Sequence, residues 1–515
     1  MAATAVDADV IVIGAGPTGL MLAGELCLGG ARVVVLEKLT EPTGQSRGLG
    51  FTARAMEVFD ARGLLSRFGQ GETVEISPMG HFGGTVFDFT VLPDAHFGAR
   101  GIPQSITEQV LEDWAGELGA DIRRGWEFVS LDDGYLDGDG VHLTARDPQG
   151  AERRLHAHWL VGCDGGASRV RAAAGFGFPG RDATRGMYLA DVTGVELRHR
   201  PLGERTPHGM VMSAPLSEGV DRIIVCPDGT PAHERERTVT YDEVARAWHH
   251  ITGEDITGGK ADWVSSFTDA TRQAEQYRRG RVFLAGDAAH IHLPAGGQGL
   301  STGVQDAVNL GWKLAAVIRG ENSPELLDSY HEERHAAGRR LLMNTRAQGI
   351  VYLGGAESDP LRELFGELIQ YDDVKRHLAG MVSHVDLRYD FGEDDTHPLT
   401  GRRLPPRRFT GADGTLRIAQ LLRSGRGVLL DLADDADVRR EASEWQGRVS
   451  VATLTAPSAD DGDVLAGATA VLVRPDGYVA WAGSPADGDP KRLRAALERW
   501  FGPADRAPAT ARPAV

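Results

Sequence analysis

The sequence has few cysteines, no excess of positive charge and no long apolar run, and each shortage excludes a class of protein. Only three of the 515 residues are cysteines, and their spacing predicts neither a disulfide framework nor a cysteine-rich metal site. The formal net charge of -18 argues against nucleic acid or an anionic membrane as the main partner. No segment approaches the roughly 18 apolar residues that span a membrane, and the N-terminus is acidic where a signal peptide is basic. We therefore expect a cytoplasmic protein without a bound metal.

Residues 9–37 have the pattern of one βαβ unit: a strand at 10–13, a glycine-rich turn at 14–19, a helix at 20–28 and a strand at 32–36. The glycines allow a tight turn, close approach of a pyrophosphate and close helix packing, with the phosphates at the helix N-terminus. Glu37 ends the second strand, where a carboxylate accepts hydrogen bonds from a ribose diol and disfavours a 2'-phosphate. The unit predicts a site for the ADP half of FAD or NAD, formed by Gly14, Gly16, Pro17, Thr18 and Gly19.

A second glycine-rich segment follows a predicted strand near residue 281 and precedes a helix with a buried face up to residue 318. Thr302 and Gln305 have the spacing of a capping box, although Ser301 is an equally good N-cap. Reduced flavin is anionic at N1, and a helix N-terminus stabilises negative charge. The helix N-terminus therefore suits a negatively charged ring such as reduced flavin, and the segment before it contains Gly286, Asp287, Pro294, Gly296, Gly297, Gln298, Gly299 and Leu300.

A third glycine-rich segment, Gly-Cys-Asp-Gly-Gly-Ala-Ser-Arg-Val-Arg at 162–171, lies between the other two. In this order the three motifs resemble those of the FAD-dependent aromatic hydroxylases, the class A flavoprotein monooxygenases that include para-hydroxybenzoate hydroxylase. Stretches at 46–59, 80–84 and 188–191 are similar to the angucycline-type polyketide hydroxylases of actinomycetes, and the likeness runs from residue 8 to about 502.

The resemblance implies roles for particular residues. It implies that Asp287 hydrogen-bonds the FAD ribityl chain, that the 294–298 turn passes beside the isoalloxazine, and that Asp164 belongs to a segment linked to both FAD and the nicotinamide coenzyme. Two further positions, Arg47 and Gln104, match residues that contact FAD in relatives, and Lys38 is a further candidate that could equally be a solvated side chain. Leu300-Ser301 stands where close relatives carry Met-Asn, so we expect altered packing there and retained flavin binding.

The function implied by the resemblance is hydroxylation of a polycyclic aromatic polyketide through a flavin C4a-hydroperoxide, with O2 and NADPH or NADH as co-substrates. Since no second GxGxxG with flanking strands occurs, the nicotinamide coenzyme is expected to dock transiently. Baeyer-Villiger oxygen insertion and a non-catalytic flavin-binding protein are the alternatives. The regiochemistry, the preferred coenzyme and the oligomeric state are left open.

Other features have more than one interpretation. His331 and His335 match HExxH, but the third-ligand position of related zinc proteases is Leu341 here, so we interpret the match as coincidence on a solvated helix. His290 and His292 lack a neighbouring carboxylate or cysteine to complete a metal site. Several apolar residues of the middle region are either core or substrate pocket: Phe82, Phe87, Phe89, Tyr188, Met210, Met212 and Trp263.

The predicted fold class is α/β, with a Rossmann-like FAD-binding domain, an inserted β-rich substrate domain and a C-terminal thioredoxin-like domain. The FAD-binding domain is expected at 1–75, 100–175 and 276–396, and the substrate domain at 76–99 and 176–275. Residues 397–502 form the C-terminal domain, which begins with a proline- and arginine-rich segment that is typical of a linker. Without cysteine it has no thiol chemistry. A disordered tail is expected at 503–515.

Overall fold

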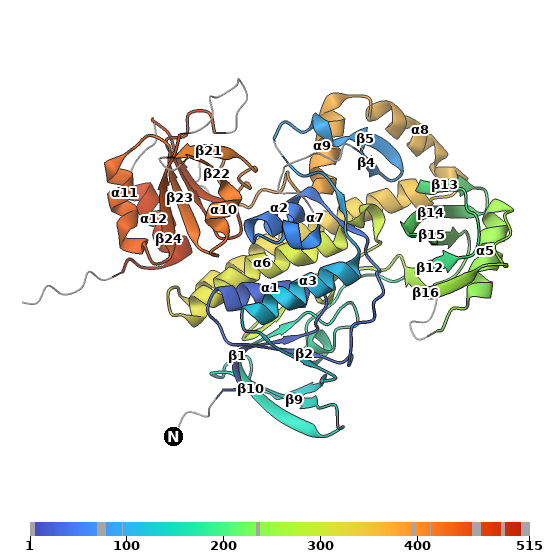
Figure 1. Ribbon diagram of the computed structural model, residues 1–515, viewed down its shortest axis with the longest axis horizontal. Coiled ribbons are helices and arrows are strands. Elements are labelled where there is room, and N and C mark those ends of the chain that lie inside the picture. Colours follow the sequence, from blue (N-terminus) through green and yellow to red (C-terminus); the bar gives the residue numbers. More distant parts are fainter. Residues whose placement is uncertain are drawn as a thin grey trace, which may run out of the picture.

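A largely parallel sheet organises the N-terminal part of the chain in the computed structural model, which describes residues 6–69, 79–94, 96–232, 237–392, 397–411, 414–455, 465–485 and 490–505 (Figure 1). Its strands lie in the order β18 (Arg278–Arg279), β19 (Val282–Leu284), β10 (Glu152–Gly162), β1 (Ala8–Ile13), β2 (Val33–Glu37) and β7 (Asp121–Arg124). β1 pairs in parallel with β2 and β10. β9 (Val141–Arg146) and β8 (Glu127–Leu131) continue the sheet in antiparallel pairing.

Three helices pack together beside this sheet: α1 (Pro17–Leu28), α3 (Gln104–Glu117) and α6 (Gly299–Ile318). Glycines allow the close contacts, because a Cβ on Gly24 would overlap the ring of Trp114 and a Cβ on Gly29 would overlap Ala315. α1 begins three residues before its predicted start, and α6 begins at Gly299 with Gln298 as its N-cap, so the predicted N-caps of α6 are wrong. The physical reason is that Thr302 lies inside the first turn, where its hydroxyl donates to the Gln298 carbonyl at 3.0 Å.

A five-stranded antiparallel sheet forms the middle of the chain, in the order β13 (Arg200–Thr206), β14 (Gly209–Ser217), β15 (Val220–Pro227), β12 (Gly186–Thr193) and β16 (Lys260–Thr268). α5 (Tyr241–Thr252) covers one face, where Tyr188 is part of the core. A small sheet of β11 (Gly180–Arg181), β17 (Thr271–Gln273) and β20 (His290–Ile291) lies at the boundary with the flavin-motif region.

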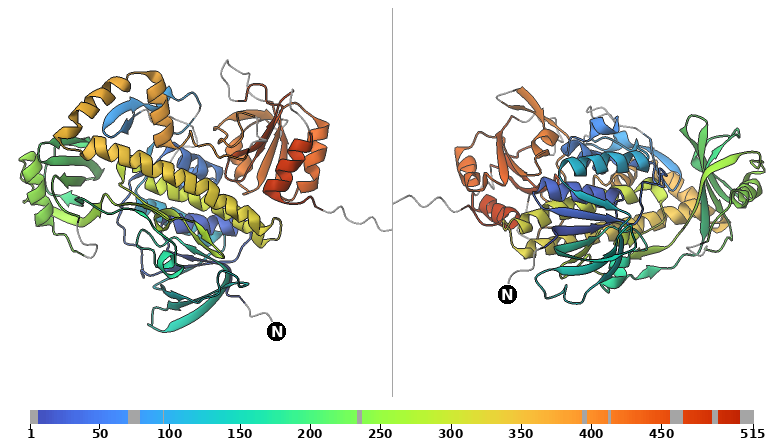
Figure 2. Two further views of the ribbon diagram at one scale, coloured as in Figure 1. Left: turned by 180° about the vertical axis from the view of Figure 1, so that it is seen from behind. Right: turned by 60° about the horizontal axis from the view of Figure 1, so that its bottom comes forward.

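The long helix α7 (Asp328–Leu353) runs from the C-terminal region towards the five-stranded sheet (Figure 2). Near its C-terminal end, the hairpin of β4 (Met79–Phe82) and β5 (Thr85–Asp88) packs on α9 (Asp372–Ser383) and α8 (Asp359–Leu368). Phe82, Phe87 and Phe89 belong to this core, which settles their interpretation as packing residues. Shorter elements complete this part: β3 (Gly50–Phe51), α2 (Ala53–Ala61), β6 (Arg100–Gly101) and α4 (Arg169–Ala173).

The C-terminal region has a four-stranded sheet in the order β24 (Val449–Thr453), β23 (Gly427–Asp431), β25 (Ala470–Val473) and β26 (Val479–Gly483). The hairpin predicted around Asp476-Gly477 is confirmed by the antiparallel pairing of β25 and β26. Around the sheet lie a second hairpin and three helices: β21 (Arg408–Gly411), β22 (Gly414–Arg417), α10 (Ile418–Leu422), α11 (Ala436–Ala442) and α12 (Pro490–Phe501). The apolar core of this region includes Trp312 and Ala316 of α6.

The segment expected to be a linker is packed instead. Leu399 and Leu404 are buried, and Arg403 forms an ion pair with Glu57 of α2 at 2.8 Å. The linker prediction is wrong because arginine, which is usually solvated, is here a buried partner of another element. Order also reaches the start of the predicted tail, since Asp505 pairs with Arg448 at 2.7 Å. Residues 506–515 lie outside the described residues.

The turn between β25 and β26 inserts charged groups among the helices of the N-terminal part. Arg474 forms ion pairs with Glu333 of α7 at 2.7 Å and with Asp476 at 2.5 Å, and Lys313 of α6 pairs with Glu333 at 3.0 Å. Burial lowers the pKa of Lys313 to about 8. Burial opposes ionisation of Glu333, but Arg474 and Lys313 outweigh it and lower its pKa to about 2. These groups therefore form one buried charge network across the interface.

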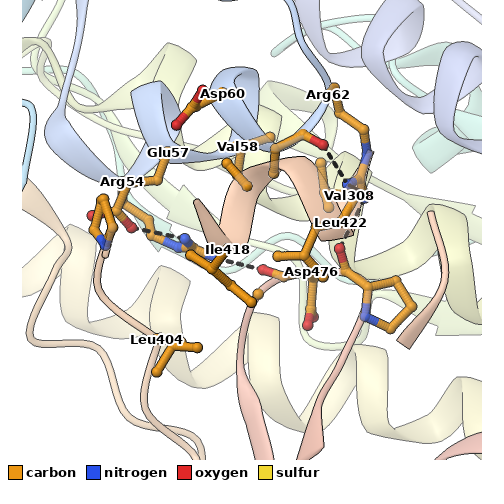
Figure 3. Close-up of a pocket in the computed structure, with 15 residues that line it drawn as sticks. Arg54, Glu57, Val58, Asp60, Arg62, Val308, Leu404, Ile418, Leu422 and Asp476 are labelled. Atoms are coloured by element: carbon orange, nitrogen blue, oxygen red, sulfur yellow. Dashed lines mark hydrogen bonds and ion pairs between the residues drawn. The ribbon is translucent and has the colours of Figure 1, made fainter. Parts of the chain in front are cut away.

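A second contact of the C-terminal region lies at α2, around the small hollow of Figure 3. Arg62 pairs with Glu25 of α1 at 2.5 Å and donates to the carbonyls of Leu422 and Pro475, both at 2.9 Å. Arg54 pairs with Glu57 at 2.8 Å. Because these arginines bond elements from both parts of the chain, the hollow belongs to the interface between them.

Within the described residues, no helix combines the length and the apolar character needed to cross a membrane.

Candidate functional site

The turn between β1 and α1 has the geometry expected of a phosphate site. Gly14 has φ of 104°, and a Cβ there would lie 2.5 Å from the Cys163 carbonyl oxygen. Gly19 packs against the Gly14 carbonyl, whereas Gly16 has open space where its side chain would point. No side chain caps the start of α1. The backbone amides of this helix end are therefore available to an anion that approaches over Gly16.

Glu37, at the end of β2, is held against this turn. Its carboxylate accepts hydrogen bonds from the backbone N–H of Ala15 at 2.8 Å and of Leu39 at 2.9 Å. Each oxygen retains a lone pair, so the carboxylate can still accept from a ribose hydroxyl. Lys38 is exposed beside it.

The other two motifs converge on the same turn. A Cβ on Gly286, whose φ is 61°, would lie 2.7 Å from Oγ1 of Thr18, and a Cβ on Gly303 of α6 would overlap the same hydroxyl. Asp287 is exposed next to Gly286. The backbone of Asp164 lies against Gly14, while its carboxylate accepts from the Ser168 hydroxyl at 2.5 Å and from the Arg169 amide at 2.6 Å. The Asp164 side chain thus shapes its own loop.

The turn at 294–299 leads directly into α6. Gly296 and Gly297 have φ of 71° and 64°, which favour glycine, and α6 also begins without a side-chain cap. The Gln298 side chain is buried and points into the protein interior, where Asn344 donates to its Oε1 at 2.8 Å. The backbone of this segment and the exposed Pro294 are therefore open to a bound ring, whereas the Gln298 side chain is not.

The segment that contains Arg47 is fastened to the start of α6. Gln104 Oε1 accepts from the Gly48 amide at 3.2 Å, and Ser301 Oγ accepts from the Thr52 amide at 2.9 Å. A Cβ on Gly48 would overlap Leu300, so Leu300 packs on this segment. Arg47 itself is exposed. The structure brings together the predicted positions from all three motifs, with Arg47 and Lys38 at the exposed rim.

A buried carboxylate, Asp306, supports the Gly286-Asp287 turn, and the sequence analysis did not identify it. Its Oδ2 accepts from the Gly286 amide at 3.1 Å and contacts His290 Nε2 at 2.8 Å, while its Oδ1 pairs with Arg334 at 2.7 Å. Burial opposes its ionisation, but Arg334 and His290 lower the pKa of Asp306 overall. A buried histidine such as His290 indicates that a hydrogen-bond partner lies close to it. The partner, Asp306, is on α6, and its distance along the chain hid it from the sequence analysis.

The five-stranded sheet turns its second face towards the 294–299 turn. One apolar cluster joins Met187 and Met210 of the sheet, Leu293 and Ala295 of the turn, and Tyr352 of α7. Met212 packs at the edge of this cluster. Met210 and Met212, which the sequence left open as core or pocket, are therefore packing residues.

A buried ion pair interrupts this otherwise apolar face. Arg222 of β15 pairs with Asp191 of β12 at 2.6 Å, lies 5.4 Å from the ring of Trp263 and donates to the Ser46 carbonyl. It therefore fixes the sheet to the segment that carries Arg47.

The HExxH match lies on α7 away from these motifs. His331 Nδ1 accepts from the Tyr277 amide at 3.2 Å, and the His331 and His335 rings lie 4.8 Å apart. The helix is only partly solvated, which corrects the prediction, because Glu333 and Arg334 are buried in ion pairs. Among the residues that the structure covers, no group of three or more histidine, cysteine or carboxylate side chains could hold a metal ion.

Two family matches cover most of the chain. Residues 7–345 match the family described as FAD binding domain, and residues 397–504 match the family described as aromatic-ring hydroxylase, C-terminal. The chain belongs to the FAD-binding aromatic-ring hydroxylase family. FAD is its cofactor and it is a monooxygenase, as the two uncapped helix ends, the open space over Gly16 and the close relatives below all support.

Relatives of this hydroxylase match it over nearly the full chain. A 12-dehydrotetracycline 5-monooxygenase/anhydrotetracycline 6-monooxygenase of Streptomyces rimosus subsp. rimosus is 43% identical, over 96% of this chain and 99% of the relative. CabE, described as an aromatic hydroxylase from angucycline biosynthesis, is 56% identical with a TM-score of 0.90, over 97% of this chain and all of that one. BexE, described in a study of oxidation during BE-7585A biosynthesis, is 57% identical with the same TM-score and coverage.

Proposed function

We propose that this hydroxylase hydroxylates a polycyclic aromatic polyketide of the angucycline type. The observation that carries the proposal is the 56% identity to an aromatic hydroxylase from angucycline biosynthesis over almost the whole chain. Hydroxylation is preferred to Baeyer-Villiger insertion because the relatives include named aromatic hydroxylases.

The residues of the chain have distinct tasks in this reaction. FAD, when bound, supplies the activation of O2 for transfer of one oxygen atom, with electrons from NAD(P)H. The N-terminal end of α1 binds phosphate, and the N-terminal end of α6 stabilises negative charge on the flavin ring through its backbone amides. The region between the five-stranded sheet and the 294–299 turn is assigned to the substrate, whose reacting atoms must be shielded from water. Asp306 holds the Gly286-Asp287 turn in place without touching the substrate.

We propose that FAD is bound by the residues predicted from the three motifs. Glu37 is assigned to the ribose, Asp287 to the ribityl chain and the 294–299 backbone to the ring. The complete set is Gly14, Gly16, Pro17, Thr18, Gly19, Glu37, Lys38, Arg47, Gln104, Asp164, Gly286, Asp287, Pro294, Gly296, Gly297, Gln298, Gly299 and Leu300. For Gln298 and Asp164 the contribution is through backbone and loop shape, since both side chains are engaged elsewhere.

We also propose the domain division 1–75, 100–175 and 276–396 for FAD, 76–99 and 176–275 for substrate, and 397–502 for a thioredoxin-like domain. The parallel pairing of β23 with β24 and the antiparallel β25–β26 hairpin support the thioredoxin-like assignment. Parts of these ranges, such as 70–78 and 456–464, lie outside the described residues. The three free cysteines support a reducing, cytoplasmic location.

Purified protein tests the proposal with a panel of polycyclic phenols. We expect several-fold faster NADPH or NADH oxidation with one or more of them, and a product that has gained one hydroxyl on an intact ring. A product with an oxygen inserted into a ring carbon-carbon bond would favour Baeyer-Villiger chemistry. Flavin binding without substrate-stimulated NAD(P)H oxidation would contradict the assignment of both reactions.

A further inference from the structure

A continuous chain of hydrogen-bonded side chains connects the β4–β5 hairpin to the 294–299 turn. The Gly83 amide donates to Gln348 Oε1 at 3.3 Å, Gln348 donates to Asn344 Oδ1 at 3.1 Å, and Asn344 donates to Gln298 Oε1 at 2.8 Å. Gln298, Asn344 and Gln348 are all buried. Each donation fixes the orientation of the next amide, so the oxygen of Gln298 faces Asn344.

His384 reaches Gln298 from the opposite side. Its Nε2 lies 3.1 Å from Gln298 Oε1, and its Nδ1 lies 2.9 Å from Nε2 of Gln305 in α6. A neutral ring that carries its proton on Nε2 satisfies both contacts. Burial, followed by the charges of Arg334 and His292, lowers the pKa of His384 to about 3, so the ring is neutral at physiological pH.

The backbone of His384 is unusual in a way that serves this contact. It ends α9 with φ of 63° and ψ of 15°, and within the described residues Asp434 is the other non-glycine residue with positive φ. Such a conformation disfavours residues with a Cβ and persists where surrounding contacts require it. Here it places the ring between Gln298 and Gln305.

With its oxygen occupied by two donors, Gln298 has its NH2 group free for the turn itself. This group donates to the Ala295 carbonyl at 3.4 Å, across the two glycines with positive φ. Glycine leaves a loop many accessible conformations, and the Gln298 contact restricts them. The turn is the segment proposed to lie beside the flavin ring.

We propose that His384 and Asn344 are positioning residues that act through Gln298 to hold the 294–299 turn in its flavin-binding conformation. In this proposal both residues act on the turn and not on the substrate or the cofactor. The inference rests on FAD lying at the three-motif site, and FAD titration of the unaltered protein tests that premise separately.

Paired variants test the proposal through FAD binding to the apoprotein. His384→Gly keeps the left-handed backbone and removes the ring, and Asn344→Leu removes the amide at similar volume. We expect each to weaken FAD binding about 3- to 10-fold, the range of one lost hydrogen bond, and to shift the flavin absorption maxima and midpoint potential. His384→Asn, which tolerates positive φ and retains a donor, should recover part of the loss.

Asp434→Gly is the matched control, because it relieves the same backbone conformation at an exposed position remote from the turn. It should leave FAD affinity, spectrum and potential unchanged. Normal FAD affinity, spectrum and potential in folded His384→Gly and Asn344→Leu would overturn the proposal. So would a loss of folded structure in both that His384→Asn shares, since that assigns the network to stability alone. An unaltered protein that binds no FAD would instead refute the premise.

Discussion

At the residue scale, Asp287 is the exposed carboxylate on which FAD retention should depend most directly. It stands beside Gly286, packed against Thr18 at the start of α1. Asp287→Ala removes a hydrogen bond from a charged acceptor, so we expect FAD affinity to fall by about 1 to 3 kcal/mol. Fluorescence titration of apoprotein with FAD measures this. Asp137→Ala, at another exposed site, is the control, and equal affinities of the two variants would refute the assigned role.

His384 also predicts how stability depends on pH. Its pKa is about 3 in the folded protein, chiefly through burial, and about 6.5 in an unfolded chain. Between these values the unfolded state binds the additional proton, so stability falls as the pH decreases from about 6.5 towards 3. Asn does not titrate, and His384→Asn should therefore lose less stability than the original protein between pH 7 and 5.

Urea unfolding at several pH values checks this difference. The substitution leaves in place the other titratable or charged groups that act on His384, so they are common to both proteins: Arg334, Arg340, His292 and Asp306. His377→Asn, at an exposed position of the same helix, should retain the original pH dependence. Parallel curves for His384→Asn and the original protein would show that His384 does not carry the effect.

The predictability of the site differs between backbone and side chain. Gly14, Gly16 and Glu37 were predictable because a βαβ unit fixes their positions by local rules. Gln298 lies in the predicted glycine-rich turn, but the position of its buried side chain depends on Asn344 and His384, which are 46 and 86 residues away in the chain. Asp306 was missed for the same reason, because its partners lie on β20 and α7.

At the scale of elements, α7 contains a motif whose spacing misleads. His331 faces Tyr277, and Glu333 is committed to Arg474 and Lys313. We expect His331→Gln with His335→Gln to leave turnover within a few-fold and metal content unchanged. Metal analysis and a steady-state assay with and without chelator measure this. Stoichiometric zinc that disappears in the double variant, together with chelator-sensitive activity, would require a metal role.

Strands and helices were predictable where the pattern is local, and less so at their ends. β1 and α1 follow from apolar runs and a glycine turn, whereas the residues predicted as N-caps of α6, Ser301 and Thr302, lie inside its first turn and bond the Thr52 amide and the Gln298 carbonyl. The 397–408 segment was mistaken for a linker because its burial comes from a neighbour, Glu57 of α2, and not from its own composition.

At the scale of the whole molecule, the C-terminal region packs on the FAD-binding part, and we expect it to stabilise that part. Its apolar core includes Trp312 of α6, and Arg474 is buried against Glu333 of α7. A chain ending at residue 396 exposes this apolar surface and leaves Glu333 without one of its buried partners. We expect it to aggregate or to lose FAD through instability, as light scattering and flavin release at increasing temperature would show.

One result would contradict a purely structural role for the C-terminal region. We expect electron transfer from NAD(P)H to FAD to require no residue beyond 396. A truncated chain that stays soluble and holds FAD normally, yet is no longer reduced by NAD(P)H, would give the C-terminal region a direct part in catalysis. Within the full chain, the substitution Arg474→Met should weaken the same interface without removing the domain.

We infer that the three motifs bind one FAD, and that the enzyme uses it to transfer one oxygen atom from O2 to an aromatic ring. The most direct measurement is turnover of a polycyclic phenol under oxygen-18 gas with NAD(P)H, followed by mass spectrometry of the product. We expect one oxygen-18 atom in a new ring hydroxyl and a yellow protein with about one FAD per chain. Oxygen from water in the product, or an unlabelled and rearranged product, would contradict it.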